Sequence, residues 1–109
     1  MQLSTVNLPI ESLKTFCQKW QIVEFSVFGS ALREDFRPNS DLDVLVQFTP
    51  NAPWTIVDLI TMQQDLEDLV KRDVDLIEKR VIETSDNWIR RNEILNTAQV
   101  IYSTTYEPA

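Results

Sequence analysis

The chain has 109 residues, with 10 lysines and arginines against 17 aspartates and glutamates, and its formal net charge is -7. Hydrophobic residues make up 43% and charged residues 25%, as in ordinary globular proteins, so the composition excludes a disordered chain and a fibrous repeat. The length predicts a single domain over residues 1–109 with room for one core, and the negative charge argues against direct binding to nucleic acid.

The first third of the chain predicts a helix followed by a buried strand. Pro9 stands where a first helical residue is expected, and apolar residues then recur every three or four positions: Ile10, Leu13, Phe16, Cys17 and Trp20. Residues 22–28, IVEFSVF, form a β-rich run that is typical of a buried central strand. Residues 31–35 then predict one helical turn before a breaker segment.

The rest of the chain predicts two more strands and two more helices. The strands are expected at residues 42–48 and 74–78. Between them, residues 55–72 predict the longest helix, with apolar positions at Ile56, Leu59, Ile60, Leu66, Leu69 and Val70. Ser85 or Asp86 is expected to cap a last helix that contains Trp88, Ile89, Ile94 and Leu95. This alternation predicts an α/β or α+β fold, with a small mixed β-sheet flanked by helices.

Several residues have simple structural interpretations. The solvated face of the long helix is expected to carry Asp65, Glu67 and Asp68. Surface positions are expected for Lys79, Arg80, Arg90 and Arg91. The core or its edge is expected to hold the three tryptophans, Trp20, Trp54 and Trp88, although Trp54 also suits a partner surface. Cys17 lies on the apolar side of the first helix and is expected to pack there.

The residue types that are missing narrow the chemistry. Without histidine, the chain has no imidazole base and no histidine metal ligand. The single cysteine excludes an internal disulfide, and the single glycine excludes a GxGxxG or Walker A loop. Acid–base or metal chemistry therefore falls to carboxylates. The lone thiol and the lack of a signal sequence or a long apolar run predict a cytoplasmic protein that does not bind membranes.

Three aspartates form the strongest candidate site. Asp41 and Asp43 are two positions apart at the start of the second strand, so their side chains point to the same side of the sheet. Two neighbouring like charges repel, and a cation between them offsets that cost. With only oxygen ligands on offer, we expect magnesium or manganese. Asp75 joins the cluster if the third strand lies beside the second, whereas Asp73 is interpreted as an exposed charge at the strand start.

Gly29 and Ser30 follow the first buried strand and precede the expected helical turn. A glycine there lets a phosphate approach the backbone, while the serine hydroxyl and the following N–H groups donate hydrogen bonds. Ten residues then separate Ser30 from Asp41. The motif is therefore Gly-Ser, ten residues, Asp-x-Asp.

With these motifs, the chain resembles the minimal nucleotidyltransferases of the DNA polymerase beta-like superfamily. FGSALREDFRPNSDLDVLVQF resembles their signature segment, and RDVDLIEKR resembles the segment that brings their third aspartate. NWIRRNEILNTAQVIYS is similar to their C-terminal helix and closing strand. The resemblance extends from about Ile10 to Ser103 and is greatest with the MNT-domain antitoxins encoded beside HEPN-domain ribonuclease toxins. Many relatives carry an arginine directly after Gly-Ser, where this chain has Ala31.

The resemblance implies a specific reaction. An antitoxin of a type VII-like toxin–antitoxin pair would transfer AMP from ATP to a tyrosine of a HEPN-family ribonuclease toxin, with release of pyrophosphate. Asp41 and Asp43 would hold two Mg²⁺ ions, and Asp75 would ligate the second ion and help deprotonate the attacking hydroxyl. The nucleotide would be bound by Gly29, Ser30, Arg33, Arg37 and Ser40. Two alternatives stay open: an antitoxin that only masks the toxin, and, more weakly, a small-molecule nucleotidyltransferase.

Overall fold

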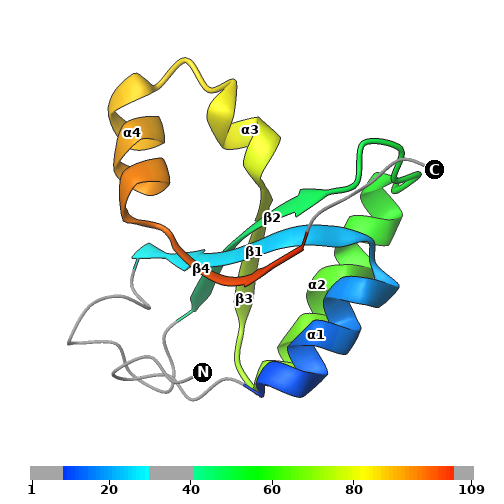
Figure 1. Cartoon of the computed structure of the whole chain (residues 1–109). Helices are drawn as coiled ribbons and strands as arrows, with labels where there is room; N and C mark the ends of the chain where they lie inside the picture. Colours follow the sequence, from blue (N-terminus) through cyan, green and yellow to red (C-terminus); the bar gives the residue numbers. More distant parts are fainter. Residues whose placement is uncertain (1–8, 30–40, 105–109) are drawn as a thin grey trace.

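The computed structural model describes residues 9–29 and 41–104, and Figure 1 shows how the helices and strands are arranged. In chain order the elements are α1 (Ile10–Lys19), β1 (Ile22–Phe28), β2 (Leu42–Phe48), α2 (Ile56–Val70), β3 (Val74–Glu78), α3 (Lys79–Glu83), α4 (Trp88–Thr97) and β4 (Gln99–Ser103). The three expected strands begin and end at the predicted residues. The expected mixed sheet flanked by helices is also confirmed. The end of the segment that resembles the family's C-terminal helix and closing strand forms β4.

The four strands form one sheet in the order β3-β2-β1-β4. β1 is antiparallel to both of its neighbours, whereas β2 and β3 are parallel. A parallel pair needs a crossover connection, and α2 supplies it between β2 and β3. β1 occupies an interior position, as its apolar sequence predicts, and β3 and β4 are the two edges.

The larger core lies between one face of the sheet and the helices α1 and α2 (Figure 1). Successive strand residues point to opposite faces, and Val44 and Val46 of β2 point to this one. The buried residues of this core are Leu13, Phe16, Cys17, Trp20, Ile22, Phe25, Val27, Leu42, Val44, Val46, Met62, Leu66 and Val74. Because each such aliphatic or aromatic side chain contributes roughly 1.5–3 kcal/mol on burial, this layer supplies most of the stability.

A smaller core lies on the opposite face of the sheet, beneath α3 and α4. Phe28 of β1 and Leu45 of β2 are buried here against Ile82 of α3 and Ile94 of α4. Leu45 points away from Val44 because neighbouring residues of a strand alternate between the two faces. The sheet is therefore covered on both faces, but the second layer is the thinner one.

Local signals set the ends of α2. The Thr55 hydroxyl accepts a hydrogen bond from the Asp58 N–H at 3.3 Å, and the Asp58 carboxylate accepts one from the Thr55 N–H at 2.9 Å. This capping box satisfies backbone donors of the first turn. Lys71 adopts a left-handed conformation with φ 62° and ends the helix at Val70, not at Arg72. α2 has 15 residues, and none of the helices in the described ranges is long and apolar enough to cross a membrane.

The apolar pattern of α2 is wider than its buried stripe. Ile56 and Ile60 are expected on the buried face, but they are 76% and 54% exposed. Met62, which the expected stripe omits, is fully buried together with Leu66. Figure 1 shows that the start of α2 extends past the end of α1. Ile60 lies beyond the first turn, on a side of the helix that points away from the buried Met62 and Leu66. The expectation for Ile56 and Ile60 is therefore wrong.

The segment after β3 also differs from the sequence pattern. The short helix α3 has five residues, which are too few to give a periodic signal. The cap of α4 is Asn87, whose side-chain oxygen accepts a hydrogen bond from the Arg90 N–H at 3.1 Å. The predicted caps, Ser85 and Asp86, are wrong by one or two positions, which is the usual scale of error at helix ends.

Only the C-terminal half of α4 packs against the sheet. Ile94 is buried, whereas Trp88 is 61% exposed and Ile89 is also exposed. Figure 1 shows the N-terminal end of α4 lying away from the sheet, which explains the difference. The expectation that Trp88 lies in the core is wrong.

Trp20 and Trp54 lie in or beside the larger core, as expected. The Trp54 indole N–H donates a hydrogen bond to the Trp20 carbonyl oxygen at 2.7 Å, and the two rings meet edge to face with centroids 5.0 Å apart. Lys79 corrects a different expectation, because it is half-buried and forms an ion pair with Glu24 at 2.9 Å. That pair ties the start of α3 to β1.

Cys17 packs in the larger core, where burial raises the pKa of its thiol from 9.0 to about 12. Between these values the folded chain keeps a proton that the unfolded chain releases. We therefore expect the free energy of unfolding to fall as the pH rises from 9 towards 12. Urea unfolding of the wild type and of Cys17→Ala across this range checks the prediction. An equally steep fall in the variant would contradict it.

Candidate active site

The pairing of β2 with β3 brings two of the predicted aspartates together. In the parallel register Asp43 lies opposite Asp75, and the Leu42 N–H donates to the Asp73 carbonyl oxygen at 2.9 Å just before that pair. Asp43 stands two positions before Leu45, so its side chain points to the face that α3 and α4 partly cover. The strand arrangement that a shared carboxylate site needs is therefore present.

Gly29 lies directly against one of these aspartates. It follows β1 with φ +65°, in the left-handed region that favours glycine, and its neighbour Phe28 is the register partner of Asp43. A Cβ atom added to Gly29 would lie 2.5 Å from Asp43 Oδ2 and 3.4 Å from Asp43 Cγ. No other residue type fits this position without moving the carboxylate. The glycine of the Gly-Ser motif and the second aspartate of the Asp-x-Asp motif thus meet in space.

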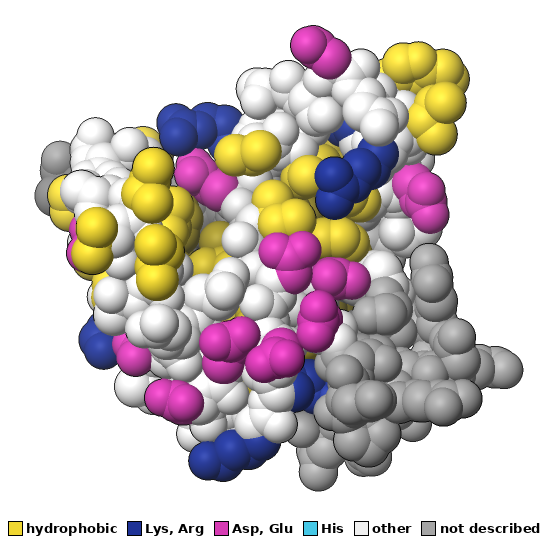
Figure 2. Space-filling view, turned by 180° about the vertical axis from the view of Figure 1, so that it is seen from behind, with side chains coloured by type: hydrophobic (Ala, Val, Ile, Leu, Met, Phe, Trp, Pro, Cys, Tyr) yellow, Lys and Arg dark blue, Asp and Glu magenta, His cyan; other side chains and the backbone are white. Residues whose placement is uncertain are grey.

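The aspartates line an open surface. Asp41, which immediately precedes β2, and Asp75 are exposed, whereas Asp43 is half-buried. On the face seen in Figure 2, several acidic side chains lie side by side. The carboxylate oxygens of Asp41, Asp43 and Asp75 are of the donor type that Mg²⁺ prefers. Asp73 is exposed, as expected for a charge at the strand start.

The described residues fit a magnesium site by donor type and by the pairing of β2 with β3. Within residues 9–29 and 41–104, however, no three acidic or cysteine side chains are already arranged to hold a metal ion. The ligand set Asp41, Asp43 and Asp75 therefore stays a prediction.

Most of the predicted nucleotide-binding residues lie outside the described part of the chain. These are Ser30, Arg33, Arg37 and Ser40, together with the helical turn expected at residues 31–35. Gly29 is the one member of that predicted set whose geometry can be described.

Two side chains of α2 near Asp75 carry contacts that the sequence pattern does not reveal. Glu67 is expected on the solvated face, but its Oε2 accepts a hydrogen bond from the Val74 N–H at 2.9 Å. Gln63, one helical turn earlier, accepts one from the Leu76 N–H through Oε1 at 3.3 Å. The spacing of four residues on one helix face is the only sequence signal of this pair.

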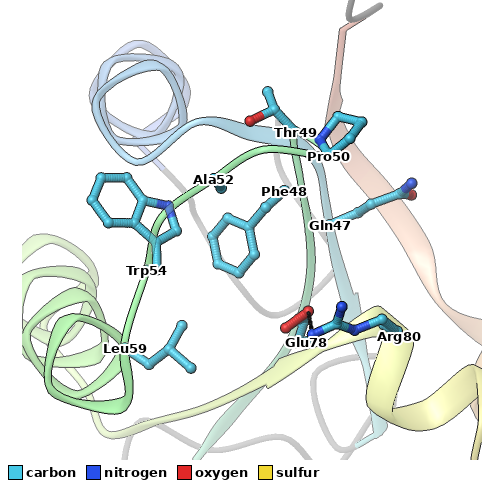
Figure 3. A pocket seen from close by; sticks show the side chains of 9 residues that line it. All are labelled: Gln47, Phe48, Thr49, Pro50, Ala52, Trp54, Leu59, Glu78 and Arg80. Carbon is cyan, nitrogen blue, oxygen red and sulfur yellow. Dashed lines mark ion pairs between the residues drawn. The ribbon is translucent and has the colours of Figure 1, made fainter.

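A cavity of about 280 Å³ lies elsewhere, near the far end of β2 (Figure 3). Phe48, Trp54 and Leu59 form its apolar side, and on its polar side Glu78 pairs with Arg80 at 3.1 Å. Phe48 is five positions beyond Asp43 along the same strand, which is roughly 16 Å at the rise of an extended chain. The cavity is therefore separate from the aspartates.

Comparison with known sequences identifies related proteins. The family model of the nucleotidyltransferase domain matches residues 10–101, from α1 to β4. A protein of Methanocaldococcus jannaschii, named as a candidate protein adenylyltransferase, is 33% identical over 69 residues, which cover 63% of this chain and 68% of that protein. A second protein of that organism with the same assignment is 32% identical over 69 residues, again covering 63% and 68%.

Solved structures share the fold. A toxin–antitoxin crystal structure with AMP-PNP matches with a TM-score of 0.68 at 17% identity, covering 89% of this chain and 75% of that one. A candidate minimal nucleotidyltransferase matches with a TM-score of 0.63 at 30% identity, covering 83% and 86%. The tri-AMPylated Shewanella oneidensis HEPN toxin in complex with MNT antitoxin contains a chain that matches at 0.60 and 13% identity, covering 87% and 70%. These likenesses confirm the fold and the resemblance that the motifs indicate.

Proposed function

This chain belongs to the nucleotidyltransferase domain family, and we propose that it is a Mg²⁺-dependent protein adenylyltransferase. In this proposal it transfers AMP from ATP to a tyrosine hydroxyl of a HEPN-family ribonuclease toxin. The modification inactivates the toxin, so the chain acts as the antitoxin of a type VII-like pair. The single observation that carries the proposal is the contact between Gly29 and the carboxylate of Asp43, with Asp75 opposite Asp43 on the next strand.

That contact has a chemical rationale. A left-handed glycine at the end of β1 leaves backbone beside the carboxylates with no side chain in the way, so a phosphate group can approach them closely. Carboxylates alone would repel the triphosphate. Asp41 and Asp43, with Asp75 as a further ligand, would hold Mg²⁺, which would supply the charge neutralisation that the phosphate groups require.

The proposed reaction is one displacement at the α-phosphorus. A bond forms from the tyrosine oxygen to this phosphorus, and the bond to the bridging oxygen of the β-phosphate breaks, so pyrophosphate leaves with its electron pair. The proton of the tyrosine hydroxyl passes to the carboxylate of Asp75, and from there to water. Such chemistry demands mainly positioning and electrostatic stabilisation, which the paired strands can provide.

The comparisons support the protein acceptor and the partner. The Methanocaldococcus jannaschii relatives are named for protein adenylyl transfer, and the Shewanella oneidensis complex holds an AMPylated HEPN toxin with its MNT antitoxin. A further fold neighbour was crystallised with AMP-PNP, an ATP analogue. ATP as the donor and a HEPN-family toxin as the acceptor are therefore the substrates that we propose.

A masking antitoxin without catalysis is the second candidate. The net charge of -7 favours it, because an acidic surface can cover a basic RNA-binding cleft. The exposed apolar residues Val81, Trp88 and Ile89 on α3 and α4 would add contact area. This candidate requires binding alone, so it predicts silencing of the toxin in the absence of ATP.

Intact mass spectrometry of the partner toxin separates the two candidates. After incubation with this chain, ATP and Mg²⁺, we expect the toxin to gain one or more AMP units, and we expect no gain without Mg²⁺. Tandem mass spectrometry should place the added groups on tyrosine. A silenced toxin of unchanged mass, in a stable complex, would overturn the enzyme and leave the masking antitoxin.

A further inference from the structure

β3 is an edge strand, and it carries the third aspartate. Its backbone groups alternate between β2 and the open edge. Because the Leu42 N–H donates to the Asp73 carbonyl oxygen, the odd-numbered residues of β3, including Asp75, bond to β2. The N–H groups of Val74 and Leu76, on either side of Asp75, therefore face away from the sheet. An edge of this kind normally bonds to water or frays.

Both of these outward N–H groups are occupied by side chains of α2. The Val74 N–H donates to Glu67 Oε2 at 2.9 Å, and the Leu76 N–H donates to Gln63 Oε1 at 3.3 Å. Glu67 and Gln63 are four residues apart, so they lie one above the other on the same helix face. Both side chains are half-buried, which strengthens their hydrogen bonds relative to bonds in bulk water. At these two positions, side chains of α2 accept the hydrogen bonds that a further strand beside β3 would accept.

We propose that Gln63 and Glu67 are positioning residues for Asp75 in the nucleotidyl transfer reaction. They act through the backbone: β2 holds Asp75 from one side, and the two α2 side chains hold its neighbours from the other. The inference rests on the proposed function insofar as Asp75 ligates metal and takes the proton of the attacking hydroxyl. The hydrogen bonds themselves do not depend on that function.

The position of Asp75 must be well defined for catalysis. A five-residue edge strand that is bonded on one side only can shift or fray, and a displacement of about 1 Å in a catalytic group can cost roughly 100-fold in rate. Asp75 is exposed, so its side chain is not held in place by burial in a core. Its position relative to Asp43 must therefore come from the backbone of β3. Gln63 and Glu67 are the side chains that fix that backbone from the edge.

The test uses variants of similar shape that keep or remove the acceptor oxygen. Glu67→Met and Gln63→Met remove it, whereas Glu67→Gln retains a carbonyl oxygen at the same place. Gln64→Met is the matched control, because Gln64 is exposed on the same helix and makes no hydrogen bond to β3. Each variant is assayed for kcat and KM of AMP transfer and for the Mg²⁺ concentration at half-maximal rate. Amide hydrogen exchange of Val74, Asp75 and Leu76 is followed by NMR without metal or nucleotide.

We expect kcat to fall about 10-fold or more in each methionine variant, and to remain within about 3-fold of wild type in Glu67→Gln and Gln64→Met. Exchange at Val74 in Glu67→Met and at Leu76 in Gln63→Met should accelerate at least 10-fold, with the larger core still protected. Unchanged kcat in both methionine variants, or an equal loss in Glu67→Gln, would overturn the proposal. If wild type transfers no AMP, the proposed function fails, and the exchange rates at Val74 and Leu76 still decide whether Glu67 and Gln63 hold the backbone beside Asp75.

Discussion

Asp43→Asn is expected to lower the rate of AMP transfer by roughly 10³-fold, with the fold and the complex with the partner toxin intact. The substitution keeps the shape of the side chain but removes the negative charge next to Gly29. If Asp43 is the magnesium ligand that we propose, its loss removes several kcal/mol of stabilisation from the developing charge on the transferring phosphate, and each 1.4 kcal/mol is a factor of 10 in rate. Asp43 is the choice for this test because its contact with Gly29 and its pairing with Asp75 are both defined.

Asp73→Asn is the matched control for that experiment. Asp73 is an exposed carboxylate two positions before Asp75, and its backbone oxygen accepts the hydrogen bond from the Leu42 N–H. Its substitution also changes the net charge by one, so it reproduces any general electrostatic effect on the acidic surface. We expect transfer by Asp73→Asn to stay within about 3-fold of wild type, since isolated surface charges contribute little. Similar losses in both variants would show that overall charge, and not a metal ligand, controls the reaction.

The toxin activity assay adds a second readout to these variants. If the chain is an enzyme, Asp43→Asn binds the toxin but leaves the ribonuclease active. If it is a masking antitoxin, Asp43→Asn silences the ribonuclease as well as wild type does. Pull-down of the complex alongside the ribonuclease assay therefore distinguishes lost catalysis from lost binding.

The strands could be predicted because the order of apolar and polar residues in each segment is typical of a strand. β1 is mostly apolar and lies inside the sheet, and β2 places Val44 and Val46 on one face and Asp43, Leu45 and Gln47 on the other. The adjacency of Asp43 and Asp75 followed once β2 and β3 were taken as neighbours. A parallel pair joined by one helix is the arrangement that the order strand, helix, strand favours.

The helix faces were less predictable, because burial depends on what lies opposite. Ile56 and Ile60 continue an apolar spacing of four residues at the start of α2, yet they are exposed, whereas Leu66 is buried in the larger core. The same holds for Trp88 against Ile94 in α4, where only one end of the helix reaches the sheet. Periodicity gives the direction of an apolar side chain around the helix axis, but not whether another element is present there.

The hydrogen bonds from Gln63 and Glu67 to β3 lie beyond sequence reasoning for another reason. A polar residue on a helix has a solvated position as its default, and nothing in the local sequence of α2 records that an edge strand runs beside it. The contact exists because α2 crosses back to place β3 parallel to β2, a feature of the whole topology. Residues that support a site through the backbone are therefore visible only in the folded chain.

One face of the sheet packs in the larger core, and the other face carries the proposed site. The larger core under α1 and α2 holds the strands together and contains no charged side chain among its buried residues. The opposite face carries Asp43 and Asp75, and its core is small enough to leave them accessible. Mutual repulsion of carboxylates lowers the free energy of unfolding. The fold tolerates this loss because the buried residues of the other layer supply most of the stability.

Gly29→Ala is expected to reduce AMP transfer by about 100-fold and to lower the free energy of unfolding by about 1–2 kcal/mol. The two effects have different causes. The stability loss comes from placing a Cβ at φ +65°, because the left-handed region is unfavourable for residues with a side chain. The rate loss comes from the 2.5 Å approach to Asp43 Oδ2, since the short carboxylate side chain can rotate away but then leaves its position beside Asp75.

Lys71→Gly provides the matched comparison. Lys71 also has a positive φ, of 62°, but it is an exposed residue at the end of α2, four positions before Asp75, and its N–H donates to the Glu67 carbonyl oxygen. Glycine relieves the backbone strain there, so we expect stability to rise by about 0.5–1 kcal/mol with AMP transfer unchanged. Urea unfolding and steady-state transfer rates for both variants complete the test. A Gly29→Ala variant that loses stability but keeps its rate of AMP transfer would show that the reaction does not depend on the position of the Asp43 carboxylate beside Gly29. That result would contradict the observation on which the proposed function rests.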